Sequence, residues 1–226
     1  MLDWLFAPQC AACGDPATTL CEPCSASLHE LGPACPRCAE PTGDHAVTCQ
    51  RCMRAPLPLE RIVAPWRFGG QLAVAIRRLK FTGRMEVARE VAPLWAPLVA
   101  AAAAPGAVVV PIPLHWRRRF RRGYDHAWLL AVHACRFAAI SPPVPALRRV
   151  HAAPPQSTLT AAERRDNLRD AFAVGDPRSI VGRSVVLVDD VVTTGATLAA
   201  AARVLHAAGA VRVIGVALAR ATSAPR

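Results

Sequence analysis

Runs of β-branched apolar residues mark the strands of a buried sheet. The run Val185–Val188 contains no polar residue, which is typical of a parallel strand covered on both faces. Val108–Pro113 has the same character and ends in prolines, and Val211–Leu218 forms a further apolar run near the carboxyl terminus. The shorter segment 62–68 (IVAPWRF) is also strand-like. The pattern therefore predicts four strands.

Helical segments alternate with these strands. An alternation of strands and helices predicts an α/β fold with a parallel sheet, whose ligands bind at the carboxyl ends of the strands. Residues 141–160 hold five prolines and little periodicity, so a mobile loop is expected there. Helices are predicted over Leu72–Phe81, Glu86–Ala104, Asp125–Ala139 and Thr160–Ala171, and from Thr197 to about Ala208, with Gly209 as the cap.

The segment that follows the strand at Val185 carries the clearest chemistry. Two acids, Asp189 and Asp190, precede the turn Thr193–Thr197 (TTGAT), and an alanine-rich helix begins at once. Backbone N–H groups and the helix dipole converge on an anion at such a helix start, and threonine hydroxyls add hydrogen bonds. An ordinary turn with an acidic cap is the simpler alternative, but a cap needs a single acid. The turn is thus predicted to hold a phosphate, and the acids to hold the hydroxyls of a ribose.

The cysteines predict a separate metal-binding segment. Eight of nine lie in the first 52 residues as CxxC pairs, which in a reducing compartment are typical of structural zinc sites closed by thiolates. Sequential pairing is favoured, with the first four on one zinc and the last four on another; a nested set of the first and last pairs is the alternative. The ninth, Cys135, is expected to be a buried structural thiol. The four pairs are Cys10/Cys13, Cys21/Cys24, Cys35/Cys38 and Cys49/Cys52.

Length and charge bound the remaining possibilities. The 226 residues allow one domain of about 150–170 residues plus a small appendage, here predicted as 60–226 and 1–55 around a proline-containing linker. A net charge of +11, from 27 basic and 16 acidic residues, suits the phosphates of nucleotides, nucleic acids or a membrane surface. A genome that favours arginine explains the total equally well. Residues Arg117–Gly123 are expected to form a basic loop.

The apolar segments indicate no membrane insertion. The most apolar run, Leu98–Val110, is interrupted by Pro105 and Gly106 and is too short to cross a bilayer. The start MLDWLFAPQC has neither a basic region nor a long apolar core, so it is not typical of a signal peptide. A cytoplasmic location is expected.

The motif at 185–197 resembles the phosphoribosyl-pyrophosphate (PRPP) loop of type I phosphoribosyltransferases. Three further segments, 79–84 (LKFTGR), 111–131 and 156–172, combine with the CxxC pairs to extend the likeness over essentially the whole chain. In this combination the chain resembles the ComF family of competence-associated proteins, which join a double zinc ribbon to a phosphoribosyltransferase-like domain. The resemblance implies an α/β fold with the parallel sheet of type I phosphoribosyltransferases.

The resemblance also implies roles for individual residues. Asp189 and Asp190 would contact the ribose hydroxyls as the catalytic pair, and Mg²⁺ would arrive with PRPP. Residues 148–167 would form a hood, with Arg164, Arg165 and Asn167 at its carboxyl side. The other ligand-binding positions would be Thr193, Thr194, Gly195, Ala196 and Thr197 around the 5-phosphate, Pro111 and Ile112 in the pyrophosphate loop, Arg122 and Gly123 near the pyrophosphate, and Lys80 near the phosphates.

One departure from the family pattern bears on function. After Gly123, where the family commonly has Phe-Asn-Gln, this chain has Tyr124-Asp125-His126. Three functions stay open: an active transferase with an unidentified acceptor, a protein that handles single-stranded DNA and keeps a PRPP site for binding, and a scaffold for a helicase-type competence partner. Candidate stacking residues for DNA are Trp116, Phe120, Tyr124 and Trp128.

Overall fold

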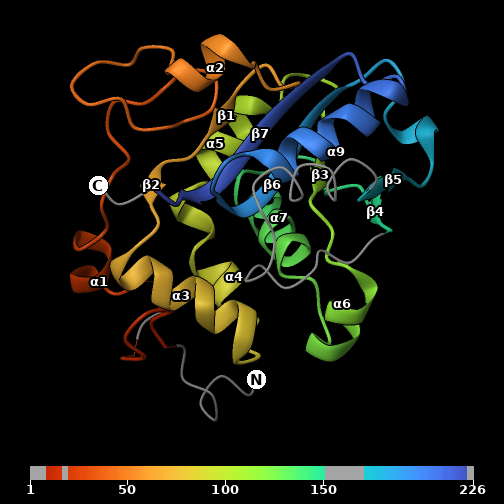
Figure 1. Cartoon of the computed structure of the whole chain (residues 1–226). Helices are drawn as coiled ribbons and strands as arrows, with labels where there is room; N and C mark the ends of the chain where they lie inside the picture. The colour runs from red at the N-terminus through yellow and green to blue at the C-terminus, as the bar shows by residue number, and fades with distance from the viewer. Residues whose placement is uncertain (1–8, 17–19, 151–170, 223–226) are drawn as a thin grey trace.

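A parallel sheet forms the centre of the molecule. The computed structural model describes residues 9–16, 20–150 and 171–222. Its five-stranded sheet has the order β1-β7-β6-β3, with β2 also pairing with β7, and every pair is parallel (Figure 1). The strands are β1 (Ile62–Val63), β2 (Trp66–Arg67), β3 (Val108–Pro111), β6 (Ser184–Val192) and β7 (Arg212–Arg220).

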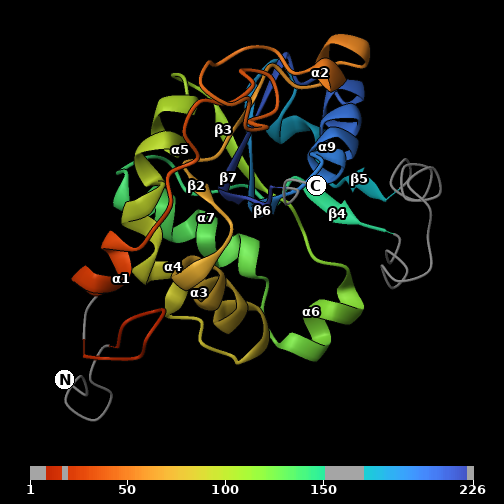
Figure 2. The ribbon, with the colours of Figure 1, turned by 60° about the vertical axis from the view of Figure 1, so that its left-hand side comes forward.

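The two faces of the sheet carry two separate layers of helices. On β6, Val186 and Val188 pack with the helices of one layer, whereas Val185 and Leu187 pack with the other. This alternation follows from the two-residue period of a strand, so a continuous apolar run is needed to fill both cores. Figure 2 shows α9 (Ala196–Ala207) on one side of the sheet and α3 (Gly70–Phe81), α4 (Val87–Glu90), α5 (Ala96–Ala102) and α7 (His126–Phe137) on the other.

The α/β fold class is confirmed, but one predicted helix is wrong. The segment Glu86–Ala104 is not continuous, because α4, a 3-10 turn at Ala92–Leu94 and α5 replace it. Pro93 and Pro97 each stand in the first turn of a new helical piece, where a proline is tolerated and a continuing helix is not.

The other boundaries shift by smaller amounts. The segment 62–68 divides into β1 and β2, and β6 and β7 run beyond their predicted ends, so that Asp189 and Asp190 lie within β6. Residues Leu147–Arg149, within the predicted loop at 141–160, form β4, which pairs antiparallel with β5 (Phe172–Val174). A 3-10 turn follows β5 at Pro177–Ser179. The predicted helix at 160–171, residues 151–160 and most of the predicted hood lie outside the described residues.

The predicted basic loop is a helix. Residues Trp116–Arg122 form α6, which His115 caps at its start and Gly123, in a left-handed conformation, caps at its end. None of its residues is buried, and Trp116 and Phe120 are 62% and 88% exposed. An arginine-rich segment has good helix propensity, so high charge alone did not predict a loop reliably.

The cysteine-rich segment spans the molecule from one end to the other. Its two short helices are α1 (Glu22–Ala26) and α2 (Gln50–Arg54). In Figure 1, α1 lies beside α3, whereas α2 lies at the opposite end of the molecule. Among the helices that the described residues form, none has both the length and the apolar character to cross a membrane.

A buried carboxyl group in α4 should make stability depend on pH. Glu90 is 1% exposed, neither of its oxygens has a hydrogen-bond partner among the described residues, and burial raises its pKa from 4.5 to about 7. Protonated Glu90 therefore contributes its full stabilisation of the fold below about pH 4.5. This contribution is lost as the pH rises through about 7. Glu90→Gln, which stays neutral, should be more stable than the parent above pH 7, by up to about 3 kcal/mol.

Urea unfolding at a series of pH values, at constant zinc concentration, measures this difference. The difference in unfolding free energy between Glu90→Gln and the parent should grow between pH 4.5 and 7 and then level off. The exposed Glu22→Gln is the matched control and should change stability by less than about 0.5 kcal/mol. A gap that is constant with pH would contradict a role for Glu90 ionisation.

Candidate functional site

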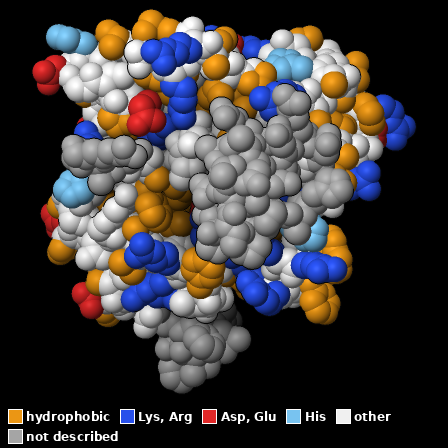
Figure 3. Space-filling model, viewed as in Figure 1, with side chains coloured by type: hydrophobic (Ala, Val, Ile, Leu, Met, Phe, Trp, Pro, Cys, Tyr) orange, Lys and Arg blue, Asp and Glu red, His pale blue; other side chains and the backbone are white. Residues whose placement is uncertain are grey.

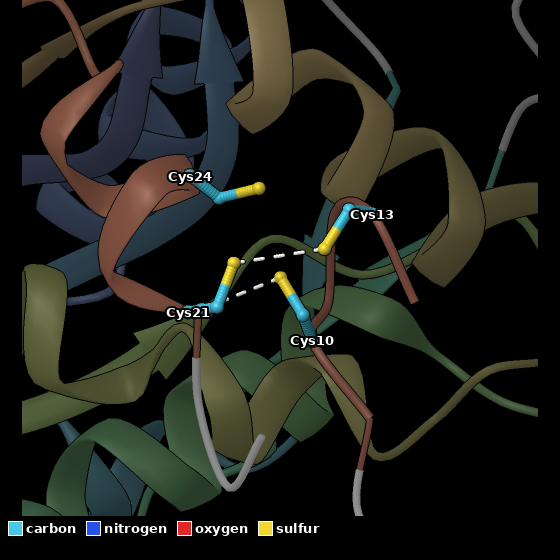
Figure 4. A group of neighbouring side chains, drawn as sticks. All are labelled: Cys10, Cys13, Cys21 and Cys24. Carbon is cyan, nitrogen blue, oxygen red and sulfur yellow. Dashed lines mark hydrogen bonds between the residues drawn. The ribbon is translucent and has the colours of Figure 1, made fainter. Parts of the chain in front are cut away.

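The first feature is a pair of cysteine clusters with the geometry of zinc sites. In each cluster, all four sulfurs lie within 4.8 Å of one another. The Sγ atoms of Cys13 and Cys21 are 3.6 Å apart, and those of Cys38 and Cys49 are 3.7 Å apart. A tetrahedral zinc with bonds of about 2.3 Å has sulfur–sulfur edges of about 3.8 Å, so both clusters fit the ion. The clusters are sequential, Cys10/Cys13/Cys21/Cys24 (Figure 4) and Cys35/Cys38/Cys49/Cys52, and not nested.

Each cluster stabilises a thiolate with the same backbone hydrogen bond. The N–H of Cys21 donates to Sγ of Cys10 at 3.4 Å, and the N–H of Cys49 donates to Sγ of Cys35 at 3.3 Å. Burial alone would raise these two pKa values, but the donated N–H groups lower the pKa of Cys10 to about 6 and that of Cys35 to about 7. The two sites are thus built alike and offer thiolates, with no position left for a substrate. Cys135 is buried in α7, where burial raises its pKa to about 11, as a structural thiol requires.

The second feature is the turn between β6 and α9. Gly195 has a φ of 79°, a left-handed conformation that glycine adopts without strain, and it is the N-cap of α9. The hydroxyl of Thr194 accepts from the N–H of Ala196 at 3.3 Å. Thr193 and Thr194 are exposed, and Thr197 lies in the first turn of α9. The turn therefore combines exposed threonine hydroxyls with a helix start, the two elements from which an anion site is built.

The acids of β6 have unlike surroundings. Asp190 is 3% exposed and forms an ion pair with Lys80 of α3, while Nε2 of His126 lies 3.6 Å from its Oδ1. Burial alone would raise the pKa of Asp190, but His126 and the Lys80 charge lower it below the usual range. Burial and the Asp190 charge together raise the pKa of Asp189, which is half-buried. One carboxylate is therefore firmly ionised, and its neighbour is held toward the protonated form.

A fourth residue extends this arrangement to α6. Nη1 of Arg122 lies 2.8 Å from Nδ1 of His126. Because a guanidinium only donates, Nδ1 must accept, and the histidine proton therefore sits on Nε2, facing Asp190. The result is a continuous polar network, Arg122–His126–Asp190–Lys80, that joins α6, α7, β6 and α3.

The residues after β3 complete the edge of the site. Pro111 ends β3, and the N–H of Ile112 donates to the carbonyl of Val188 at 2.8 Å, so both lie beside Asp189 in the neighbouring strand. Asp125 accepts from the N–H groups of Leu114, Ala127 and Trp128, at 2.8, 3.1 and 3.4 Å. Its carboxylate thus caps α7 and holds the loop after β3 in place.

A positively charged cleft adjoins the network. Its volume is about 330 Å³, and two of its lining residues, Lys80 and Arg122, belong to the network. Phe81 is 73% exposed at the rim, with the Arg122 guanidinium 5.5 Å from its ring centre. Figure 3 shows Lys and Arg side chains gathered over α3 and α6. The cleft is lined by Lys80, Phe81, Gly83, Arg118, Arg121, Arg122 and Tyr124.

The structure brings most of the predicted site residues together. Lys80, Arg122, Asp189 and Asp190 meet at the carboxyl end of β6, with the turn Thr193–Thr197 directly after them. Arg164, Arg165 and Asn167 lie outside the described residues. Sequence reasoning did not identify His126 as a partner of Asp190. The available signal was its place four residues after Arg122, where the family commonly has glutamine.

Comparisons with known proteins agree with both features. A double zinc ribbon domain family matches residues 1–53, and a phosphoribosyl transferase domain family matches residues 144–225. DNA utilization protein YhgH of Salmonella typhi is 33% identical over 199 residues, covering 86% of this chain and 87% of that protein. Competence protein F of Haemophilus influenzae is 30% identical, covering 84% and 85%. Competence protein ComFC of Bacillus subtilis is 29% identical, covering 84% and 79%.

Proposed function

Because the chain belongs to the ComF family of double-zinc-ribbon, phosphoribosyltransferase-like proteins, we propose that it binds PRPP with Mg²⁺ and handles single-stranded DNA during DNA uptake. The observation that carries the proposal is the Arg122–His126–Asp190–Lys80 network. It connects Asp190 of β6, a proposed ribose-binding residue, to a cationic cleft with aromatic walls. Names of the relatives, DNA utilization protein and competence protein, support the role in DNA uptake.

Each element has a distinct part in ligand binding. The Thr193–Thr197 turn would receive the 5-phosphate, Asp189 and Asp190 would accept hydrogen bonds from the ribose hydroxyls, and Pro111 and Ile112 would line the pyrophosphate side. Mg²⁺ bound with PRPP would neutralise pyrophosphate charge. His126 would keep Asp190 ionised and oriented, and Arg122 would present its remaining donors to the pyrophosphate.

An active phosphoribosyltransferase is the second candidate, favoured by the family match over residues 144–225. Ribose C1 would lose pyrophosphate to an acceptor through a transition state with positive charge on the sugar. The ionised Asp190 would stabilise that charge, while Arg122 would stabilise the departing anion. No acceptor base is identified by the described residues.

Isothermal titration with PRPP and Mg²⁺ tests the binding site. Asp190→Asn should weaken binding because it removes the charge that orients Lys80 and accepts from the ribose. Thr194→Ala should weaken it because a phosphate oxygen loses a donor. Each change should cost on the order of 1–3 kcal/mol of binding free energy, and the half-buried Ser179→Ala, in the 3-10 turn away from the site, should cost nothing measurable. Equal PRPP affinity in all four proteins would place the ligand elsewhere.

DNA binding through α6 should depend on salt. Each phosphate contact contributes about 0.7 to the log–log salt slope for single strands, so the combined change of Arg117, Arg118, Arg119 and Arg121 to Gln should flatten the slope by up to about 2.8 and lower affinity. Glutamine preserves helix propensity, and PRPP affinity should change little because Arg122 and the turn remain.

A second quadruple variant separates local from net charge effects. Arg54, Arg61, Arg178 and Arg203 are exposed and lie outside α6, so their change to Gln alters net charge equally. Fluorescence anisotropy of a labelled oligo-dT strand at several salt concentrations measures both proteins. Equal slopes for the two variants would show that α6 is not a DNA contact.

Three further assignments complete the proposal. We place the boundary between the ribbon segment and the transferase-like domain at 1–55 and 60–226. We place the protein in the cytoplasm, where its thiolates stay reduced and available to zinc. The ribbons are also the expected docking surface for a helicase-type partner, which co-purification with and without zinc would test.

A further inference from the structure

The second cysteine cluster lies beside the phosphate turn. Leu57, in the linker, packs against Cys35, Cys38 and Cys52 and also against the core under α9. A Cβ placed on Gly195 would lie 3.1 Å from Cδ1 of Leu57 and 2.9 Å from Cδ1 of Ile62. Leu57 thus stands between the zinc-binding cysteines and the glycine of the phosphate turn.

A buried arginine makes a second connection. Arg220 is fully buried at the end of β7, where its guanidinium donates to the carbonyl of Cys38 and pairs with Glu40. In the sheet, Arg220 is the register partner of Val192, the residue before the phosphate turn. The N–H of Ala221 donates to the carbonyl of Val192 at 2.9 Å. The second ribbon is therefore connected to the residue before the turn and to the glycine within it.

The first cluster has different neighbours. Cys10, Ala11 and Ala12 belong to the core formed with the helices on the opposite face of the sheet. Nη1 of Arg78, in α3, donates to the carbonyl of Ala11 at 3.5 Å. Among the described residues, only the second ribbon contacts the elements around Gly195. The first ribbon can therefore serve as a control for the effect of the second on the phosphate turn.

We propose that Leu57 is a positioning residue, through which the zinc-loaded second ribbon holds Gly195 in its phosphate-binding conformation. The inference rests on the proposed PRPP site. Zinc fixes the positions of the four thiolates, and their packing against Leu57 gives that side chain a rigid support. Without it, the turn could relax toward the linker, and its N–H groups would no longer converge on one phosphate. Displacements of about 1 Å cost affinity and rate steeply in such sites.

Leu57→Ala is the first test, with Leu28→Ala as its matched control at the first ribbon. Leu28 is a half-buried leucine that packs against the other core cluster. Both variants should keep two zinc ions by elemental analysis. Leu57→Ala should bind PRPP with Mg²⁺ about tenfold more weakly, whereas Leu28→Ala should stay within about twofold of the parent. Equal affinities in the two variants would overturn the inference.

Zinc removal from one ribbon at a time is the second test. Cys21 and Cys49 occupy equivalent positions and are both half-buried. Cys49→Ser should weaken PRPP binding at least about threefold more than Cys21→Ser. The reverse order, or equal losses, would contradict a special role for the second ribbon.

A ligand-free measurement separates this inference from the proposed function. Hydrogen exchange of the peptide covering residues 192–198 should be faster in Leu57→Ala and Cys49→Ser than in the parent, with no PRPP present. If the parent binds no PRPP but this exchange still changes in the variants, the ligand assignment fails. The link between the second ribbon and the turn then still stands. Unchanged exchange at 192–198 in both variants would overturn the link whatever PRPP does.

Discussion

Removal of zinc is expected to unfold the cysteine-rich segment of residues 9–54 while the parallel sheet stays folded. Structural zinc contributes an apparent binding free energy of about 10–16 kcal/mol in small metal-dependent domains. The ribbons have little core of their own, and α1 and α2 have five residues each, far too few for an independent helix. The sheet, in contrast, is held by two apolar cores on its two faces.

Hydrogen exchange with and without a chelator measures this result. Peptides from 9–54 should lose protection on chelation, whereas those from β6 and β7 should keep most of theirs. Elemental analysis of anaerobically purified protein should give about two zinc ions per chain, since eight thiolates close two tetrahedral sites. One zinc ion or none, or a global loss of protection, would contradict the prediction.

Gly195→Ala should have the largest effect of any single change at the phosphate turn. Alanine at a left-handed φ costs about 1–2 kcal/mol. Its methyl group would also stand 2.9 Å from Ile62 and 3.1 Å from Leu57, closer than carbon atoms pack. Relief of this contact must move the turn, so we expect stability to fall by about 2–4 kcal/mol and PRPP binding to be lost.

Gly182→Ala isolates the crowding from the backbone strain. Gly182 has a φ of 68°, but no atom lies within 4 Å of its added Cβ. This control should lose only about 1 kcal/mol of stability and keep its PRPP affinity. Thermal unfolding and titration of both variants provide the comparison. Similar effects in the two proteins would show that close packing at Gly195 does not matter.

Local signals in the sequence predicted much of the fold and of the site. The unbroken run at Val185 identified a strand with two covered faces, and the CxxC spacing identified the metal clusters. The two acids and the TTGAT turn identified the place where network and turn meet. These features are local because each depends on residues within one strand, one turn or one CxxC pair.

Other features depended on contacts between distant segments. The approach of His126 to Asp190 arises from how α7 packs on β6, which no local pattern encodes. Arg220 lies beyond the predicted end of the last strand at Leu218, and its bond to Cys38 requires the complete fold. The break of the predicted 86–104 helix, in contrast, had a local signal, since Pro93 and Pro97 each begin a new helical piece.

The position of β7 bears on how the sheet assembles during synthesis. It follows the other strands of this sheet in the chain, yet it lies inside the sheet, paired with β1 and β2 on one edge and β6 on the other. β1 and β2 therefore have no partner strand in this sheet until residues 212–220 have been synthesised. A truncation that removes residues 212–220 would split the sheet rather than trim its edge, so it is expected to be as damaging as a much earlier truncation.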